Sequence, residues 1–172
     1  MERGGKIVTI TPEYSPPATK SDYWLPCRPG LGDTAIFLGI TKLLMDRGLY
    51  DAAFVKTFTD LPLLIRTDTL KRLDPVDVFP SYTPGLSPDG PSFTIQGLTR
   101  EQYAKLQDYV IFDARSRSLR PVTRDDVGAS LTEKGLDPDL EFTGTVTLTD
   151  GKQVEVLTIW QAYRRHLADY DL

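Results

Sequence analysis

The segment from Lys6 to Gly48 constrains the fold of this chain more than any other. Apolar residues at Ile7–Ile10, closed by turn residues, are typical of a buried strand of a parallel sheet. Trp24–Leu25 gives a second strand signal. The prolines and polar residues between them leave room for a single helical turn and not for a long crossover helix. The segment therefore predicts a small parallel strand pair, as in one half of a nucleotide-binding crossover.

The strongest helix signal of the chain follows this strand pair and ends at Gly48. Asp33 or Gly32 is expected to cap its amino terminus, and Gly48 to stop it. Its apolar residues recur at helical spacing, at Ile36, Ile40, Leu43 and Leu44.

Shorter elements are predicted after this helix. Tyr50–Phe58 predicts a second short helix with Asp51 near its start, followed by the apolar run Leu61–Arg66, which Pro62 interrupts. We expect this region to form a helix that packs back onto the first one. From Asp74 to Gly97, prolines and glycines break every periodic pattern, and a loop of this length usually binds something or wraps a neighbour.

The carboxyl-terminal part of the chain predicts alternating helices and strands. The expected elements are a short helix at Thr99–Leu106, a strand at Tyr109–Asp113 and a helix at Thr123–Lys134 that Gly135 stops. Around the pair Asp150-Gly151, alternating residues at Thr145–Leu148 and Val154–Val156 predict a β-hairpin. A terminal amphipathic helix is expected to begin after Thr158, with Ile159, Tyr163 and Leu167 on its apolar side.

These signals predict an α/β fold in which a small parallel sheet with flanking helices is followed by an α+β extension containing a β-hairpin. We expect region boundaries at residues 1–73, 74–98 (the Pro/Gly-rich loop) and 99–172. The chain leads almost at once into its first strand, so we expect it to begin within a fold.

Composition excludes several classes of function. The 24 acidic and 20 basic residues form no block of like charge, which argues against nucleic-acid binding and against a polybasic membrane anchor. A single cysteine, Cys27, excludes an internal disulfide and an iron–sulfur cluster carried by this chain alone. The apolar runs are too short to cross a bilayer, and the segment Met1–Ile10 lacks the features of a signal peptide. The default expectation is a cytoplasmic protein without direct membrane insertion.

Two turns carry candidate binding residues. Thr11-Pro12-Glu13 ends the first strand, and an acidic residue in that place presents a carboxylate to ribose hydroxyls in dinucleotide-binding folds. The glycine-rich phosphate turn is missing, however, because Gly4-Gly5 precede the strand. For Glu13 alone, the residues favour a solvated turn carboxylate.

The second turn, Arg28-Pro29-Gly30-Leu31-Gly32-Asp33, is more specific. It combines flexible backbone and a helix amino terminus with a guanidinium and a carboxylate. The two oxygens of Asp33 match the paired N–H donors of a guanine edge, and helix-start amides favour an anion. The alternative is that Asp33 is only a cap and Arg28 only a surface charge, and the residues alone favour that alternative.

No catalytic residue and no metal site is predicted. Cys27 has no nearby histidine, and His166 is expected to be solvated on the terminal helix. Trp24 and Trp160 are expected to anchor the core. The spacing of the remaining acidic candidates implies no metal site; these are Asp60, Asp68 and Asp77.

The motifs resemble the guanine-dinucleotide-binding region of molybdopterin oxidoreductases of the dimethyl-sulfoxide-reductase superfamily. The nearest likeness is to catalytic alpha subunits of nitrate reductases and, nearer still, nitrite oxidoreductases. Residues matching the family pattern are Thr11, Pro12, Glu13 and Tyr14; Asp22, Trp24 and Leu25; Pro29, Gly30 and Asp33; and Phe58–Leu64. Ile95–Leu172 resembles an insertion of the nitrite-oxidoreductase type, so the likeness covers essentially the whole chain.

This resemblance implies that residues 1–73 are a partial guanine-dinucleotide-binding region for a bis(molybdopterin guanine dinucleotide) molybdenum cofactor. It implies that Thr11 and Glu13 meet the ribose or guanosine, that Asp33 meets the guanine edge, and that Arg28 and Gly30 belong to the same site. The chain departs from the family pattern in two places. Gly32 adds one residue to the usual turn, and Thr11 replaces an aspartate, as it does in the nitrate-reductase branch.

Catalytic subunits of that family are several times longer and carry a molybdenum-coordinating aspartate and a cysteine cluster motif that we do not find here. The first hypothesis is therefore a piece of an alpha subunit, inactive alone, which is completed by the rest of that subunit and, by resemblance, by an iron–sulfur beta subunit. Membrane association would then arise only through partners. The second hypothesis is a noncatalytic guanine-nucleotide-binding or assembly module. A third, an α/β domain without a nucleotide function, ranks lowest.

Overall fold

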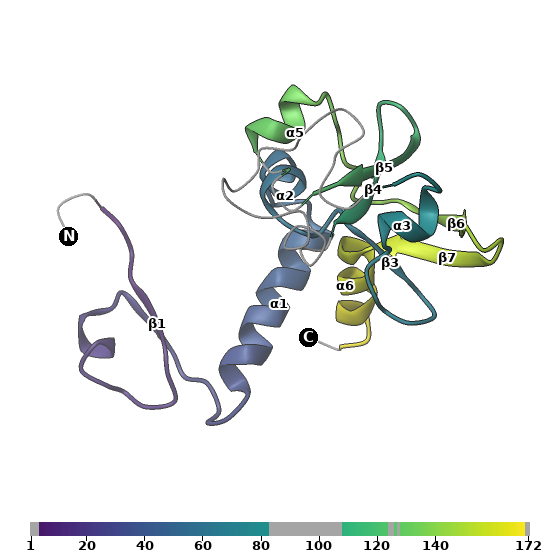
Figure 1. The fold of residues 1–172 in the computed structure, drawn as a ribbon. Helices are drawn as coiled ribbons and strands as arrows, with labels where there is room; N and C mark the ends of the chain where they lie inside the picture. Colours follow the sequence, from purple (N-terminus) through teal and green to yellow (C-terminus); the bar gives the residue numbers. More distant parts are fainter. Residues whose placement is uncertain (1–3, 83–107, 124–125, 127, 171–172) are drawn as a thin grey trace, which may run out of the picture. The chain divides into compact units, whose positions relative to one another are not determined.

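The computed structural model describes residues 4–82, 108–123, 126 and 128–170. The chain divides into two compact units, which are described separately below. The amino-terminal unit comprises Met1–Leu49 and Leu167–Leu172, and the main unit comprises Tyr50–His166. Helices, a small parallel sheet and antiparallel hairpins are all present (Figure 1). The predicted α/β fold class is therefore confirmed.

The amino-terminal unit contains the predicted parallel strand pair. Strand β1 (Val8–Ile10) pairs with strand β2 (Tyr23–Leu25) along its full length, with Thr9 opposite Trp24. Their connection contains one 3₁₀ turn, η1 (Ala18–Lys20), as the short spacing predicts. A connection this short leaves no room for a helix that covers one face of the sheet.

The predicted burial of these strands is wrong within the described residues. Val8 is 52% exposed, Tyr23 59% and Leu25 46%. Two strands form a sheet too small to cover its own faces, because a face is buried only when another element packs on it. The fully buried side chains among the described residues of the amino-terminal unit are those of Ala18, Met45 and Leu167.

Helix α1 (Gly32–Asp46) confirms the strongest helix prediction. It ends as predicted at Gly48, whose φ of +64° lies in the left-handed region that glycine tolerates. There the Leu49 N–H donates to the Leu44 carbonyl over 2.9 Å, and the Gly48 N–H donates to the Met45 carbonyl over 3.2 Å. These two bonds form a Schellman motif, which satisfies carbonyls at the helix end.

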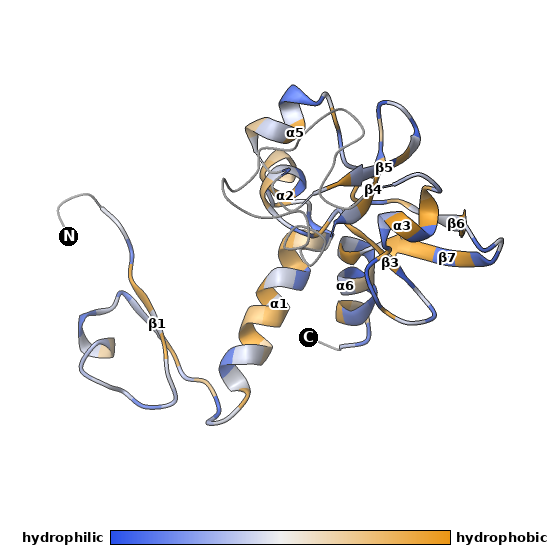
Figure 2. Ribbon diagram, viewed as in Figure 1, coloured by the Kyte–Doolittle hydropathy of each residue, from blue (hydrophilic) through white to orange (hydrophobic). Residues whose placement is uncertain are grey.

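The start of α1 differs from the prediction. The residue before the helix is Leu31, which makes no side-chain capping bond, and both Gly32 and Asp33 lie inside the first turn. The cap predicted at either residue is therefore wrong. Helix α1 contains several hydrophobic residues, which are orange in Figure 2. Some of their side chains are left exposed: Phe37 is 59% exposed and Leu43 45%.

The main unit is built on antiparallel strands. Its three-stranded sheet has the order β3-β7-β6, and β4 and β5 form a separate hairpin (Figure 1). Its elements in chain order are α2 (Ala52–Phe58), β3 (Leu64–Arg66), α3 (Pro75–Val78), β4 (Tyr109–Asp113), β5 (Ser118–Val122), α5 (Ala129–Glu133), β6 (Thr143–Thr147), β7 (Gln153–Thr158) and α6 (Ile159–Ala168).

Three predicted elements of the main unit are confirmed: the short helix near Asp51, the hairpin around Asp150-Gly151 and the terminal helix. Asp51 caps α2 by accepting a bond from the Phe54 N–H over 2.9 Å. The predicted hairpin is formed by β6 and β7, and Gly151 in its turn has a φ of +85°. Helix α6 begins after Thr158, whose hydroxyl accepts a bond from the Gln161 N–H over 3.1 Å.

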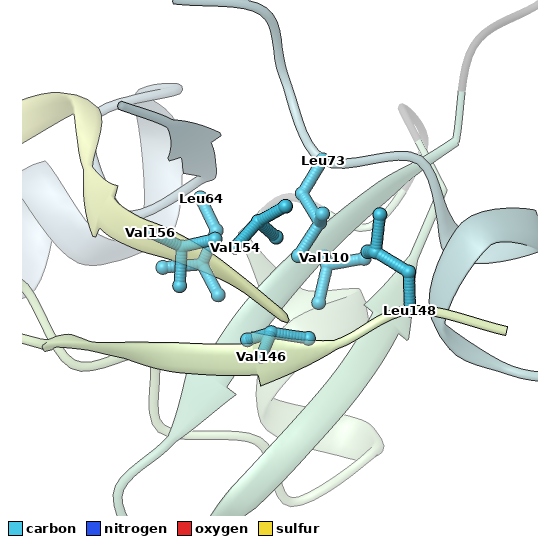
Figure 3. Packing of buried hydrophobic residues seen from close by; sticks show 7 residues of the cluster. All are labelled: Leu64, Leu73, Val110, Val146, Leu148, Val154 and Val156. Carbon is cyan, nitrogen blue, oxygen red and sulfur yellow. The ribbon is translucent and has the colours of Figure 1, made fainter. Parts of the chain in front are cut away.

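Among the described residues of the main unit, two apolar clusters form the core. Strand β4 contributes to both, because its successive side chains point to opposite faces: Val110 packs in one cluster and Ile111 in the other. Figure 3 shows the larger cluster, which joins β3, β4, β6 and β7. Its buried members are Leu64, Leu73, Val110, Val146, Leu148, Val154 and Val156. The smaller cluster contains Leu63, Ile111, Val122 and Leu131.

Three predictions in the main unit need correction. The end of the apolar run Leu61–Arg66 is strand β3, which pairs with β7 and is not part of a helix. The predicted irregular stretch begins with helix α3, which Asp74 caps by accepting from the Val76 N–H over 3.0 Å. Helix α5 begins at Ala129, later than predicted.

Other predictions have no outcome in this structure. The helix predicted at Thr99–Leu106 and most of the Pro/Gly-rich loop lie outside the described residues. How the helix at Tyr50–Phe58 packs relative to the first helix is not determined, because the two belong to different units. The region boundaries after residues 73 and 98 stay a prediction.

Candidate functional site

The parallel pairing of β1 and β2 brings the two predicted turns together. In parallel strands both carboxyl ends lie at the same sheet edge, so the turn after β1 and the turn after β2 become neighbours. Backbone bonds continue the pairing into them. The Thr11 N–H donates to the Leu25 carbonyl over 3.3 Å, and the Cys27 N–H donates to the Thr11 carbonyl over 3.4 Å.

The turn after β1 is held by its own polar groups. The Thr11 hydroxyl accepts a bond from the Glu13 N–H over 3.2 Å and donates to the Glu13 carbonyl. The Ser15 N–H donates to the same carbonyl over 2.8 Å. The Glu13 side chain is exposed, and its carboxylate accepts no bond from any residue that the structure describes. It is therefore available to a ligand.

The turn after β2 combines exposed charges with two constrained glycines. Gly30 has a φ of +99°, and a Cβ built on it would meet no atom within 4 Å. Gly32 is close to the Cys27 side chain, since a Cβ built there would lie 3.3 Å from the Cys27 Cβ. The Asp33 Oδ1 accepts from the Thr34 N–H over 2.8 Å, which leaves Oδ2 open. The Arg28 side chain is exposed.

Trp24 joins the two strands at this edge, which the sequence did not indicate. Its indole Nε1–H donates to the Thr11 carbonyl over 3.2 Å. Its ring meets the Tyr14 ring edge-on, with centroids 5.1 Å apart and an interplanar angle of 71°. Trp24 is 37% exposed, so its predicted role as a core anchor is wrong, whereas Trp160 is 4% exposed and confirms that role.

Asp22 holds the opposite, amino-terminal end of the strand pair. Its Oδ2 accepts from the Ile7 N–H over 2.8 Å, and its Oδ1 lies 3.2 Å from the Lys6 ammonium. The Ile7 backbone bond, followed by the Lys6 contact, lowers the pKa of Asp22 below its usual value. Both strand ends are thus fixed by side chains, and the carboxyl end also has open polar groups in Glu13 and Asp33.

Candidate metal ligands do not gather in the part of the chain that the structure describes. No group of three or more His, Cys, Asp or Glu residues among the described ones is arranged to bind a metal ion. Cys27 is a free, half-buried thiol, and His166 lies exposed on α6. Within the same described ranges, none of the helices has the length and apolar character of a membrane-spanning segment.

The main unit has a charged groove that the sequence did not indicate. Its volume is about 690 Å³, and its walls carry residues that follow β3. The two arginines in it are already engaged: Arg66 forms a two-bond pair with Asp68, and Arg72 lies 2.9 Å from the carboxylate of Asp60. The groove is lined by Arg66, Thr69, Lys71, Arg72, Leu73, Asp74, Asp77 and Asp108.

The comparisons identify three informative relatives. The respiratory nitrate reductase subunit alpha of Haloferax mediterranei is 34% identical over 170 residues, which cover 98% of this chain. The perchlorate reductase subunit alpha of Dechloromonas aromatica is 31% identical over 176 residues, or 96% of this chain. The thiosulfate reductase molybdopterin-containing subunit of Salmonella typhimurium is 41% identical over 59 residues, or 34% of this chain.

The matched region is a small part of each relative. This chain covers 16% of the nitrate reductase subunit, 18% of the perchlorate reductase subunit and 8% of the thiosulfate reductase subunit. No family model matches the chain. The matches to the two alpha subunits nevertheless cover nearly all of this chain, and they agree with the family resemblance that the motifs indicate.

Proposed function

Because this chain belongs to the molybdopterin oxidoreductase family and matches a segment of its catalytic alpha subunits, we propose that its amino-terminal unit binds one guanosine arm of a bis(molybdopterin guanine dinucleotide) molybdenum cofactor. The observation that carries this proposal is the parallel pairing of β1 and β2. It brings Thr11–Glu13 and Arg28–Asp33 to the sheet edge at which nucleotides bind in open α/β folds.

The open carboxylates suit the donor groups of a guanosine. A guanine edge presents paired N1–H and N2–H donors, which match the two oxygens of one carboxylate. We assign that contact to Asp33, since its Oδ2 is open. Glu13, whose carboxylate has no partner among the described residues, would accept from ribose hydroxyls, with Thr11 shaping the turn beneath it.

The remaining predicted residues suit the phosphates. Arginine guanidinium groups form charge-assisted hydrogen bonds with phosphate oxygens, and the exposed Arg28 would do so here. Gly30 leaves its backbone open to close approach, because no atom lies near the position of a side chain. The first turn of α1 follows directly, and free N–H groups at a helix start favour an anion.

At the level of the whole protein, we propose a molybdenum oxidoreductase subunit acting on an oxyanion of the nitrate or nitrite type. The bound molybdenum would supply the oxidation and reduction, and residues of this chain would hold the nucleotide end of the cofactor. The rest of the alpha subunit and an iron–sulfur beta subunit are the proposed partners. On this proposal the chain alone has no turnover, and purified chain that reduces nitrate or oxidises nitrite would overturn it.

The alternative is a noncatalytic guanine-nucleotide-binding or assembly module derived from the same family. The sheet edge that carries Glu13 and Asp33 supports either function, because these residues would contact the guanosine and not the molybdenum. The two differ in affinity. A partial site should bind guanosine diphosphate with a dissociation constant of about 1 mM or weaker, near 4 kcal/mol of binding free energy, whereas a module evolved to bind alone should bind more tightly.

The test is a titration of the purified chain with guanosine diphosphate, followed by calorimetry and by amide chemical shifts. We expect binding by the wild type and its loss in Asp33→Ala. Asp46→Ala is the matched control, because it removes a carboxylate from the other end of the same helix. Loss of binding in both variants, or no shifts in the wild type at any concentration, would overturn the guanosine assignment.

A further inference from the structure

The indole of Trp24 links the two turns of the proposed guanosine site. It belongs to β2, yet its Nε1–H donates to the carbonyl of Thr11, which follows β1. The bond is 3.2 Å long and crosses the two strands at their carboxyl ends. No other side chain in the described part of the chain is bonded to that carbonyl, which otherwise accepts only the Cys27 N–H over 3.4 Å.

The same ring also supports the residue next to Glu13. Tyr14 packs its ring edge-on against Trp24, although Tyr14 itself is 61% exposed. An edge-to-face pair of this kind has a preferred geometry and adds to the attraction of simple burial. Trp24 therefore holds the residues on both sides of the Pro12–Glu13 turn, Thr11 by a hydrogen bond and Tyr14 by its ring.

Trp24 makes these contacts although its side chain is not buried. At 37% exposed, Trp24 contributes less burial than Trp160, which is 4% exposed in the main unit. The polar and the aromatic contacts of Trp24 both end on one turn. That turn carries the carboxylate proposed to bind ribose.

Resting on the proposed function, we propose that Trp24 is a positioning residue for the nucleotide: it fixes the Thr11–Tyr14 turn, so that Glu13 is held ready for the ribose. Trp24 does not itself contact the ligand on this view. Its effect is on the conformational freedom of the turn, because a binding group that is already ordered loses less entropy when the ligand arrives.

The chain supplies its own controls. Trp24→Phe keeps an aromatic ring against Tyr14 but removes the indole N–H, and Asp22→Asn weakens the opposite end of the same strand pair. The only other tryptophan is Trp160, whose indole N–H donates to Glu141 over 3.0 Å in the main unit. Its indole signal in a nitrogen-15 spectrum is therefore an internal reference for that of Trp24.

The experiment titrates the full chain and both variants with guanosine diphosphate and measures the affinity of each from its backbone amide chemical shifts. The two indole signals are followed in the wild type and in Asp22→Asn, because Trp24→Phe keeps only that of Trp160. We expect the Trp24 signal of the wild type to shift and the Trp160 signal to stay. Trp24→Phe should weaken binding about fivefold, as expected for one lost hydrogen bond, with an unchanged thermal midpoint. Asp22→Asn should bind as the wild type does.

The outcomes separate this inference from the proposal beneath it. If the wild type binds but Trp24→Phe binds equally well, the positioning role is wrong and the guanosine site stands. If Asp22→Asn weakens binding as much as Trp24→Phe does, the effect is general loosening and the inference also fails. If the wild type shows no shifts, both are wrong. The indole shift in the wild type needs no substitution, so the inference stays testable even if a variant fails to fold.

Discussion

The amino-terminal unit and the main unit differ in how they bury apolar side chains. The described residues of the main unit form two apolar clusters, and in the larger one Leu64, Leu73 and Val110 are fully inaccessible. In the amino-terminal unit, the strands and α1 leave large apolar side chains such as Phe37 exposed. The proposed site lies in the unit with the smaller core. We infer that packing holds the main unit together, whereas local bonds shape the amino-terminal one.

The largest expected effect follows from removing a core side chain. Leu64→Ala should destabilise the main unit by about 2 to 5 kcal/mol, because the surrounding strands cannot collapse onto the space. Leu43→Ala, in the exposed face of α1, should cost less than about 1 kcal/mol. Urea unfolding measures both: the fluorescence of Trp160, in a Trp24→Phe background, follows the main unit for Leu64→Ala, and helical circular dichroism follows α1 for Leu43→Ala. Equal losses of unfolding free energy in Leu64→Ala and Leu43→Ala would contradict the inference that packing holds the main unit together more than the amino-terminal one.

A buried ion pair of the main unit gives the next effect. Asp126, with a side chain 3% exposed, pairs with Lys134, which is 17% exposed, and accepts a bond from the Thr123 N–H over 2.8 Å. Asp126→Ala leaves Lys134 without this partner and should cost about 3 kcal/mol.

Asp60→Ala is the matched control for Asp126→Ala. The pair of Asp60 with Arg72 is exposed on both sides, so its loss should cost at most about 1 kcal/mol. Both variants are compared by urea unfolding. A loss at Asp60 as large as that at Asp126 would mean that burial does not decide the strength of these pairs.

Glycine substitutions compare a turn in each unit. Gly48 and Gly151 have φ values of +64° and +85°, so alanine at either position should cost about 1 to 2 kcal/mol. Gly151→Ala should lower the unfolding midpoint of the main unit. Gly48→Ala should reduce helical circular dichroism and leave the Trp160 fluorescence transition unchanged. If Gly48→Ala shifts the Trp160 transition as much as Gly151→Ala does, the two units unfold together and not separately.

The smallest effect concerns pH. A two-bond pair with Arg66, aided by Lys152, lowers the pKa of Asp68 from 3.8 to about 2. Because the folded pKa is the lower one, this carboxylate adds stability above pH 3.8, and the contribution disappears as the pH falls through about 2. Asp68→Asn should therefore differ from the wild type at neutral pH and converge with it near pH 2.

The control for this pH effect is Glu133→Gln, which removes an exposed carboxylate with no partner among the described residues. Its stability should follow the wild type at every pH. Unfolding curves at a series of pH values measure the difference. A gap between Asp68→Asn and the wild type that widens toward low pH would have the wrong sign and would exclude this linkage.

The sequence predicted those elements whose signals are local. The stop at Gly48, the short helix that starts near Asp51 and the turn at Asp150-Gly151 each depend on a few neighbouring residues, and all three are confirmed. The expected parallel pair is confirmed as well, because a single helical turn was the only connection that its spacing allowed. Strand β3 was missed, since an apolar run of that length is equally typical of a buried helix.

The candidate site was predicted in part. Thr11, Glu13, Arg28, Gly30 and Asp33 were selected from two turns, and the parallel pairing brings both turns to one edge. Their roles as nucleotide contacts stay a prediction. The part played by Trp24 was missed, because a tryptophan is most often a core residue and only the bond to the Thr11 carbonyl distinguishes it. The cap assumed at Asp33 was wrong because it too was inferred from the most common role of the residue type. The helix in fact begins one residue before Asp33.

By itself, the sequence determined the turn at Asp150-Gly151, the stop of the first helix at Gly48 and the family of this chain. These depend on residues that are neighbours along the backbone, where glycine conformation and short-range bonds decide the outcome. Tertiary structure alone decided that β3 pairs with β7, which tryptophan is buried, and where the indole of Trp24 donates its bond. Each of these joins residues far apart in sequence, and the free energy that selects them comes from packing and pairing that no local pattern records.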